Sequence, residues 1–192
     1  GFSDITILLN EISRQTGLVT YHAPMLATLS RSDQKSQDSF FKVLTGNFEP
    51  VNSPAMQIMT GSTAHGRLIG GNLASLIHLL GTPHEPDWEN NILVIEDVGE
   101  APYKIDRMLT QLHLSGRLEK LAGLILGTFT DADNQEEEWS ATIWERAHEL
   151  TGGEIPLWVN FPSGHGTRNV TLPLGMETVM DSASGQLEFI VP

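Results

Sequence analysis

The stretch NILVIED, residues 91–97, decides the fold class that the sequence predicts. Its four consecutive apolar residues end in two acids, which is typical of a buried strand whose carboxyl end carries polar groups. Apolar residues then recur at helical spacing through 103–116, where Gly116 predicts the end of a helix. The run LAGLILGTF (121–129) predicts another buried strand. A strand, a helix and a strand in succession indicate an α/β fold.

The residues ahead of this stretch predict shorter elements. Helical spacing of apolar residues indicates a helix over 4–15 that stops near Gly17. LVTYH (18–22) is typical of a short strand. The stretch 30–39 is polar, and we expect a short helix over 39–44 after it.

The stretch 66–83, GRLIGGNLASLIHLLGTP, predicts a strand, a glycine turn and a helix over 73–80. An acidic loop is expected at 131–139, followed by a helix over 142–150 that ends at a pair of glycines. Three strand-like pieces complete the chain: 155–161, 169–175 and 187–192.

The Pro- and Asn-containing segment 47–61 predicts a domain boundary. Residues 1–60 would then be the C-terminal part of a doubly wound N-terminal α/β domain that carries a nucleophile. Residues 61–192 would form a β-rich α/β domain.

The composition excludes several classes of function. A formal net charge of -13, with only 11 Lys and Arg, disfavours nucleic acid and anionic membranes as partners. No apolar run approaches the roughly 20 residues that cross a bilayer. The absence of cysteine removes disulfides and thiolate catalysis, and it is compatible with the cytoplasm, where we expect the protein.

Two candidate catalytic residues lie in short loops. Ser3, in GFSDIT (1–6), is either an N-cap of the helix that follows or a nucleophile, because both roles suit a hydroxyl at a helix N-terminus. His165 lies between Gly164 and Gly166 rather than in a periodic apolar run, which favours a functional role. His78 and His148 fall within predicted helices and are better candidates for buried structural histidines.

Glu96 is the candidate acid, because a carboxylate at the end of a buried strand needs a partner such as an imidazole N–H. Asp97 and Glu100 are its rivals. A serine, an imidazole and an acid are the residue types of a nucleophilic triad, but their order along the chain does not identify one. The seven histidines lack H-E-x-x-H spacing, which disfavours a zinc hydrolase.

Five stretches together resemble the LD-carboxypeptidase family of serine peptidases, which also contains the microcin-immunity peptidases. The resemblance implies a triad of Ser3 as nucleophile, Glu96 as acid and His165 as base. It also implies that the backbone N–H of Asp4 is an oxyanion donor and that the reaction needs no metal and no organic cofactor. The stretches are GFSDIT (1–6), 66–83, ILVIEDVGEAPYKIDRMLTQLHLSG (92–116), GLILGTF (123–129) and FPSGHGTRNVTLPLG (161–175).

The resemblance further implies cleavage of the L,D bond before the terminal D-alanine of murein tetrapeptides, in cytoplasmic cell-wall recycling. The substrate would be a peptide with a terminal D-amino acid, whose carboxylate Lys104, Arg107 or Arg168 could bind. Two alternatives stay open: a microcin-type peptidase acting on peptidyl-adenylates, and a non-catalytic binding remnant of the fold.

Members of this family carry most of an α/β domain ahead of the nucleophile, including a second oxyanion donor. We therefore expect a separate N-terminal fragment of the same protein as a partner, with a truncated chain as the alternative. Self-association as a homodimer also stays open.

Overall fold

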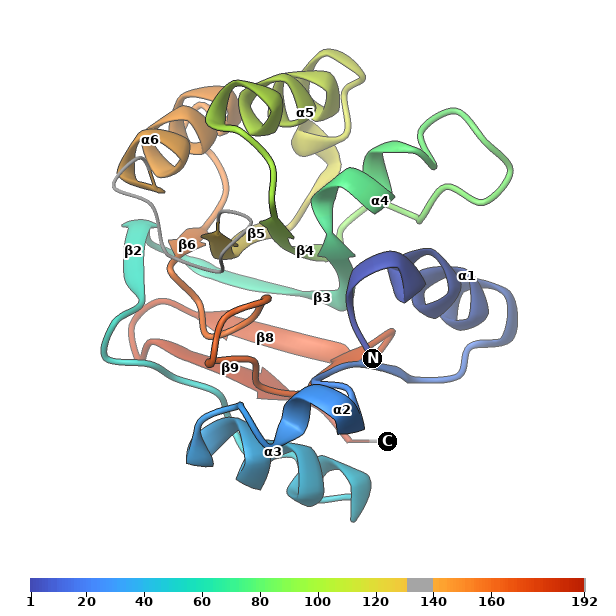
Figure 1. Cartoon of the computed structure of the whole chain (residues 1–192). Coiled ribbons are helices and arrows are strands. Elements are labelled where there is room, and N and C mark those ends of the chain that lie inside the picture. The colour runs from blue at the N-terminus through green and yellow to red at the C-terminus, as the bar shows by residue number, and fades with distance from the viewer. Residues whose placement is uncertain (131–139, 192) are drawn as a thin grey trace.

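A seven-stranded mixed sheet organises residues 1–130 and 140–191, which the computed structural model describes (Figure 1). The acidic loop expected at 131–139 lies outside these residues. In spatial order the strands are β2 (Gln57–Thr60), β6 (Leu157–Val159), β5 (Gly123–Thr130), β4 (Ile92–Val98), β3 (Thr63–Asn72), β8 (Glu177–Asp181) and β9 (Gln186–Phe189).

The four central strands β6, β5, β4 and β3 are parallel, whereas β2, β8 and β9 pair antiparallel at the two sides. Both faces of the central strands are buried, which explains the continuous apolar runs of β4 and β5. The carboxyl ends of parallel strands lie at one edge of the sheet, so Glu96 in β4 comes to that edge.

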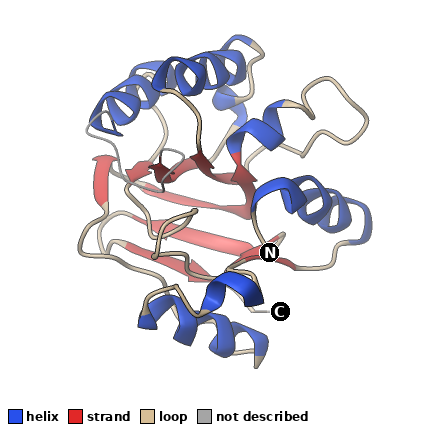
Figure 2. Ribbon diagram, in the orientation of Figure 1, coloured by secondary structure: helices blue, strands red, loops and turns tan. Residues whose placement is uncertain are grey.

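Helices and short strands cover the two faces. On one face, α4 (Leu73–Ile77), α5 (Pro102–Leu114) and α6 (Ser140–Thr151) pack on β4 and β5 through residues such as Leu93, Leu109 and Ala147. On the other face, Trp158, Phe161 and Met180 belong to a second apolar cluster. Figure 2 shows helices above and below the sheet.

The remaining elements lie in the first part of the chain, apart from β7 and a second 3-10 turn. A 3-10 turn (Ser3–Ile5) leads into α1 (Thr6–Thr16), and β1 (Thr20–His22) pairs antiparallel with β7 (Leu172–Leu174). Helices α2 (Leu26–Leu29) and α3 (Gln34–Leu44) follow, and a second 3-10 turn (Leu118–Lys120) precedes β5.

The glycine turn predicted near residue 70 is wrong, because Gly70 and Gly71 continue strand β3 beside β4. Both have positive φ, 131° and 130°. A Cβ at Gly70 would lie 1.8 Å from the carbonyl oxygen of Val94, and one at Gly71 would lie 2.5 Å from Oγ1 of Thr6. Glycine is needed here for close backbone approach within the sheet.

Most predicted elements are present with different bounds. Helix α1 ends at Thr16, and the φ of 72° at Gly17 is that of a left-handed C-cap. Helix α3 begins at Gln34, earlier than predicted, because Asp33 caps it by accepting a hydrogen bond from the Ser36 amide. Helix α4 ends at Ile77 rather than residue 80.

Strands β2 and β8 were not predicted. The division at residue 60 stays a prediction. Within the described residues, no helix combines the length and apolar character needed to cross a membrane.

Candidate active site

Glu96 and His165 form a hydrogen-bonded pair at the carboxyl edge of the sheet. Glu96 is 1% exposed, and its Oε2 lies 2.7 Å from Nδ1 of His165. Burial raises the pKa of the Glu96 carboxyl, and the hydrogen bond to His165 opposes that rise. This pairing leaves Nε2 as the ring nitrogen available to exchange a proton with another group.

The rivals of Glu96 have other partners. Asp97 accepts hydrogen bonds from the side-chain amide of Asn72 and from the backbone N–H groups of Ala74 and Val98, at 2.8–2.9 Å. Burial raises the pKa of Asp97. Glu100 forms an ion pair with Lys104 at 2.9 Å. Of the three acids, Glu96 is the one bonded to His165.

The loop that carries His165 is held by close packing. Gly164 has φ 142°, and a Cβ there would lie 2.1 Å from Oγ1 of Thr128. The ring of Phe2 contacts the His165 ring edge-on, with centroids 4.5 Å apart. The segment ahead of Ser3 therefore packs directly on the candidate base.

Ser3 is not the N-cap of the following helix. The residues in the cap positions are Phe2 for the 3-10 turn and Ile5 for α1, and neither side chain makes a capping hydrogen bond. Ser3 itself has φ 67°, which is uncommon for a residue with a Cβ. A strained serine on a turn into a helix is the backbone arrangement of a nucleophile elbow.

Ser3 borders two cavities. The first, of about 450 Å³, is lined by Ser3, His165 and Arg31 among others, and we call it the His165 cavity. The second, of about 410 Å³, is lined by Ser3, by His78 and by three carboxylates, Asp4, Asp97 and Glu100, and we call it the acidic cavity. The structure thus brings Ser3 and His165 to one cavity and joins Glu96 to His165.

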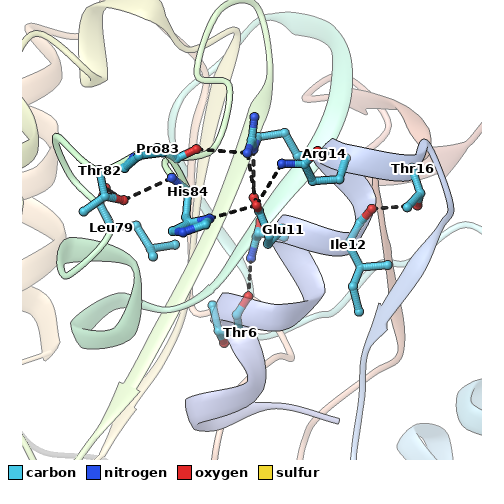
Figure 3. A network of polar contacts seen from close by, with 11 residues as sticks. Thr6, Glu11, Ile12, Arg14, Thr16, Leu79, Thr82, Pro83 and His84 are labelled. Atoms are coloured by element: carbon cyan, nitrogen blue, oxygen red, sulfur yellow. Dashed lines mark hydrogen bonds and ion pairs between the residues drawn. The ribbon is translucent and has the colours of Figure 1, made fainter.

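A polar network holds α1, the helix that follows Ser3, against the connection between α4 and β4 (Figure 3). Glu11 lies 2.9 Å from Nε of Arg14 and 2.9 Å from Nδ1 of His84. The hydrogen bond from Arg14 is the main cause that lowers the pKa of Glu11 to about 2. Asn10 adds hydrogen bonds to the backbone of Gly70 in β3.

The remaining sequence candidates lie in varied settings. Asp4 is exposed at the first turn. Arg107 lies over the ring of Tyr103, 5.0 Å from its centroid, and Arg168 donates to Oδ1 of Asn160 at 3.2 Å. None of Lys104, Arg107 and Arg168 lines either cavity at Ser3 among the described residues.

Two histidines expected to be buried differ in exposure. His78 is exposed, with Nδ1 lying 2.6 Å from the Ala74 carbonyl oxygen. His148 is half-buried beside Thr60. Within 1–130 and 140–191, no three His, Asp or Glu side chains are grouped to hold a metal ion.

Sequence reasoning missed two residues near the site. Arg31 stands in a polar stretch without periodicity, so no pattern indicated it. His22 ends the predicted strand 18–22 and is completely buried beside Phe2, with ring centroids 6.2 Å apart. The sequence signal for His22 was its position at the end of the predicted strand 18–22.

Comparison with known proteins decides the family. The family model described as the LD-carboxypeptidase C-terminal domain matches residues 65–180. The chain belongs to the LD-carboxypeptidase family. The resemblance found in the sequence is therefore confirmed.

Relatives extend the LD-carboxypeptidase match over nearly the whole chain. A putative carboxypeptidase from Synechocystis is 38% identical over 99% of this chain and 62% of its own length. A probable murein peptide carboxypeptidase from Bacillus subtilis is 35% identical, over 95% of this chain and 59% of its own length. The chain thus spans about 60% of these curated relatives.

Solved structures confirm the α/β fold of this chain. A muramoyltetrapeptide carboxypeptidase from Oxalobacter formigenes has a TM-score of 0.79 at 30% identity, covering 98% of this chain and 66% of that one. The microcin C7 self immunity protein MccF has a TM-score of 0.83 at 24% identity, covering 100% and 66%. The latter likeness concerns the fold alone.

Proposed function

We propose that this protein is a serine-type LD-carboxypeptidase that hydrolyses the bond before the terminal D-alanine of murein tetrapeptides. The observation that carries the proposal is the Glu96–His165 hydrogen bond of 2.7 Å at a cavity that Ser3 also lines. The printed names of relatives, among them a murein tetrapeptide carboxypeptidase from Pseudomonas aeruginosa that is 36% identical, support this substrate class. The proposed setting is cytoplasmic cell-wall recycling.

In the proposed reaction, Oγ of Ser3 attacks the carbonyl carbon of the scissile amide while Nε2 of His165 accepts the hydroxyl proton. Glu96 accepts the Nδ1 hydrogen bond, so it fixes the tautomer and stabilises the imidazolium that forms. The tetrahedral oxyanion is stabilised by the backbone N–H of Asp4. His165 then returns the proton to the amine of D-alanine, which leaves, and water hydrolyses the acyl-enzyme by the same steps.

The burial of Glu96 fits this role. A carboxylate that is shielded from solvent needs a partner to stabilise its charge. In the resting state that partner is a neutral imidazole, and during the reaction it becomes an imidazolium with a full positive charge. The positive φ of Ser3 fits the role of nucleophile, because a strained turn presents the hydroxyl instead of folding it back as a helix cap.

The test measures release of D-alanine from the murein tetrapeptide L-Ala-γ-D-Glu-meso-diaminopimelate-D-Ala by the native protein, using mass spectrometry. Ser3→Ala should lower kcat by about a thousandfold or more. Ser30→Ala, at an exposed serine outside both cavities, is the matched control and should retain the wild-type rate. Equal rates for wild type and Ser3→Ala would refute the assignment.

A second candidate is cleavage of a peptidyl-adenylate, as in microcin immunity. It is favoured by 28% identity to the microcin C7 self-immunity protein from Escherichia coli over 94% of this chain. The two candidate functions can be separated by measuring which of two molecules, the tetrapeptide or an aminoacyl sulfamoyl adenosine, inhibits the protein more strongly. A murein peptidase is inhibited weakly by the nucleoside and strongly by the tetrapeptide, and the reverse order supports the second candidate. Binding of tetrapeptide without any turnover would indicate a non-catalytic remnant.

A further inference from the structure

The two cavities at Ser3 are not equivalent, because His165 lines one of them and not the other. In acyl transfer to a serine, the imidazole that takes the hydroxyl proton returns it to the leaving amine. The leaving group must therefore lie on the side of the imidazole. If the proposed function holds, on which this inference rests, the leaving D-amino acid occupies the His165 cavity and the acyl portion extends toward the acidic cavity.

The charges of the two cavities agree with that direction. The leaving D-amino acid carries a free carboxylate, which the three acids of the acidic cavity would repel. The lining of the His165 cavity contains the cation Arg31 and no Asp or Glu. A carboxylate is thus accommodated on the side where His165 also lies.

Arg31 has an unusual status among the arginines of this acidic chain. Arg14, Arg67, Arg117 and Arg146 each form an ion pair with a carboxylate. The side chain of Arg31 has no hydrogen bond, ion pair or ring contact with any residue in the described part of the chain. Arg31 is exposed and lines the His165 cavity, so its N–H donors are available to a ligand.

The backbone that carries Arg31 is joined to the loop that carries His165. The N–H of Asp33 donates to the carbonyl oxygen of Thr167 at 2.8 Å, and the N–H of Arg31 donates to that of Thr28 at 2.9 Å. Arg31 and His165 are thus each two residues from one end of the same hydrogen bond. The backbone at Arg31 is therefore tied to the backbone of the His165 loop by a hydrogen bond.

We propose that Arg31 is a specificity-determining residue that binds the terminal carboxylate of the leaving D-amino acid. A guanidinium forms two parallel hydrogen bonds with a carboxylate, which fixes the orientation as well as the charge of the group. The enzyme would then select peptides that end in a free carboxylate at the residue after the scissile bond.

The test compares two substrates, the tetrapeptide with a free terminal carboxylate and the same peptide with a terminal carboxamide. Arg31→Gln should lower kcat/KM for the free acid by about 10- to 150-fold, the range for one charge-assisted contact. The change for the carboxamide should be less than about threefold, because that substrate lacks the partner charge. Arg31→Lys should retain part of the preference, since it keeps the charge without the fork.

Arg67→Gln is the matched control, because Arg67 of β3 is an exposed arginine paired with Glu177 of β8, outside both cavities. It should leave both rates unchanged. An equal loss on acid and amide, or no loss on either, would overturn the role of Arg31 while the activity itself stands. A wild-type protein that cleaves neither peptide would instead refute the proposed function. The thermal midpoint of each variant shows whether it is folded.

Discussion

His22 should make this protein less stable as the pH falls below neutral. The side chain is completely buried, and neither ring nitrogen has a hydrogen-bond partner among the described residues. Burial lowers the pKa of His22 from 6.5 to about 3. Between these pH values the unfolded chain binds a proton at His22 that the folded chain does not bind. His22 therefore does not reduce the free energy of unfolding above about pH 6.5, and it reduces that free energy progressively as the pH falls toward 3.

The size of the effect follows from those two values. At pH 5, the unfolded state gains about 2 kcal/mol from protonation of this one imidazole, whereas at pH 7.5 it gains about 0.1 kcal/mol. The buried acids Glu96 and Asp97 act in the opposite direction, because burial raises their pKa and their contribution to stability grows as the pH falls. Comparison with a variant that lacks only His22 separates its contribution from theirs.

The assay is urea denaturation of wild type and His22→Leu at pH 7.5 and pH 5. The free energy of unfolding of wild type should fall by about 2 kcal/mol more than that of the variant between the two values. His65→Gln, at an exposed histidine, should keep the wild-type difference. A His22→Leu protein with the same pH response as wild type would show that His22 does not cause the loss of stability at low pH.

Two further predictions concern single positions. Gly70→Ala should lower the free energy of unfolding by about 3 kcal/mol or more, or prevent folding, because its Cβ would meet the Val94 carbonyl. Gly17→Ala, where the Cβ would meet open space, should lower the free energy of unfolding by about 1 kcal/mol in the same urea titration, and equal losses in the two variants would contradict the close contact at Gly70. Asp97→Asn should lower the free energy of unfolding by about 1–3 kcal/mol, because hydrogen bonds are lost, but should keep kcat within severalfold of wild type. Glu96→Gln should lower kcat by about a hundredfold or more, and a greater loss of kcat in Asp97→Asn than in Glu96→Gln would make Asp97 the catalytic acid.

The central strands could be predicted from the sequence, because burial on both faces leaves long apolar runs in β4 and β5. The short strand β8 could not, since only two of its five residues are buried and its hydrogen bonds come from β3 and β9, which are distant in the sequence. Gly70 and Gly71 were misinterpreted for a related reason. Glycine normally indicates a turn, and the contacts that require it here, with Val94 and Thr6, arise only in the folded chain.

The site was predicted in part. The residue types of Ser3, Glu96 and His165 and their loop positions were visible in the sequence, but the choice between Glu96 and its neighbours needed the family resemblance. The structure then supplied the 2.7 Å contact between residues 69 positions apart. Arg31 could not be predicted, because it is an isolated cation in a polar stretch and the cavity that it lines exists only in the folded chain.

Labelling with a fluorophosphonate tests whether Ser3 is the nucleophile that the His165–Glu96 pair activates. We expect a single covalent adduct that peptide mapping assigns to Ser3, absent in Ser3→Ala and formed at least about a hundredfold more slowly in His165→Ala. An adduct on another serine, or labelling of Ser3 at the wild-type rate in His165→Ala, would contradict this assignment.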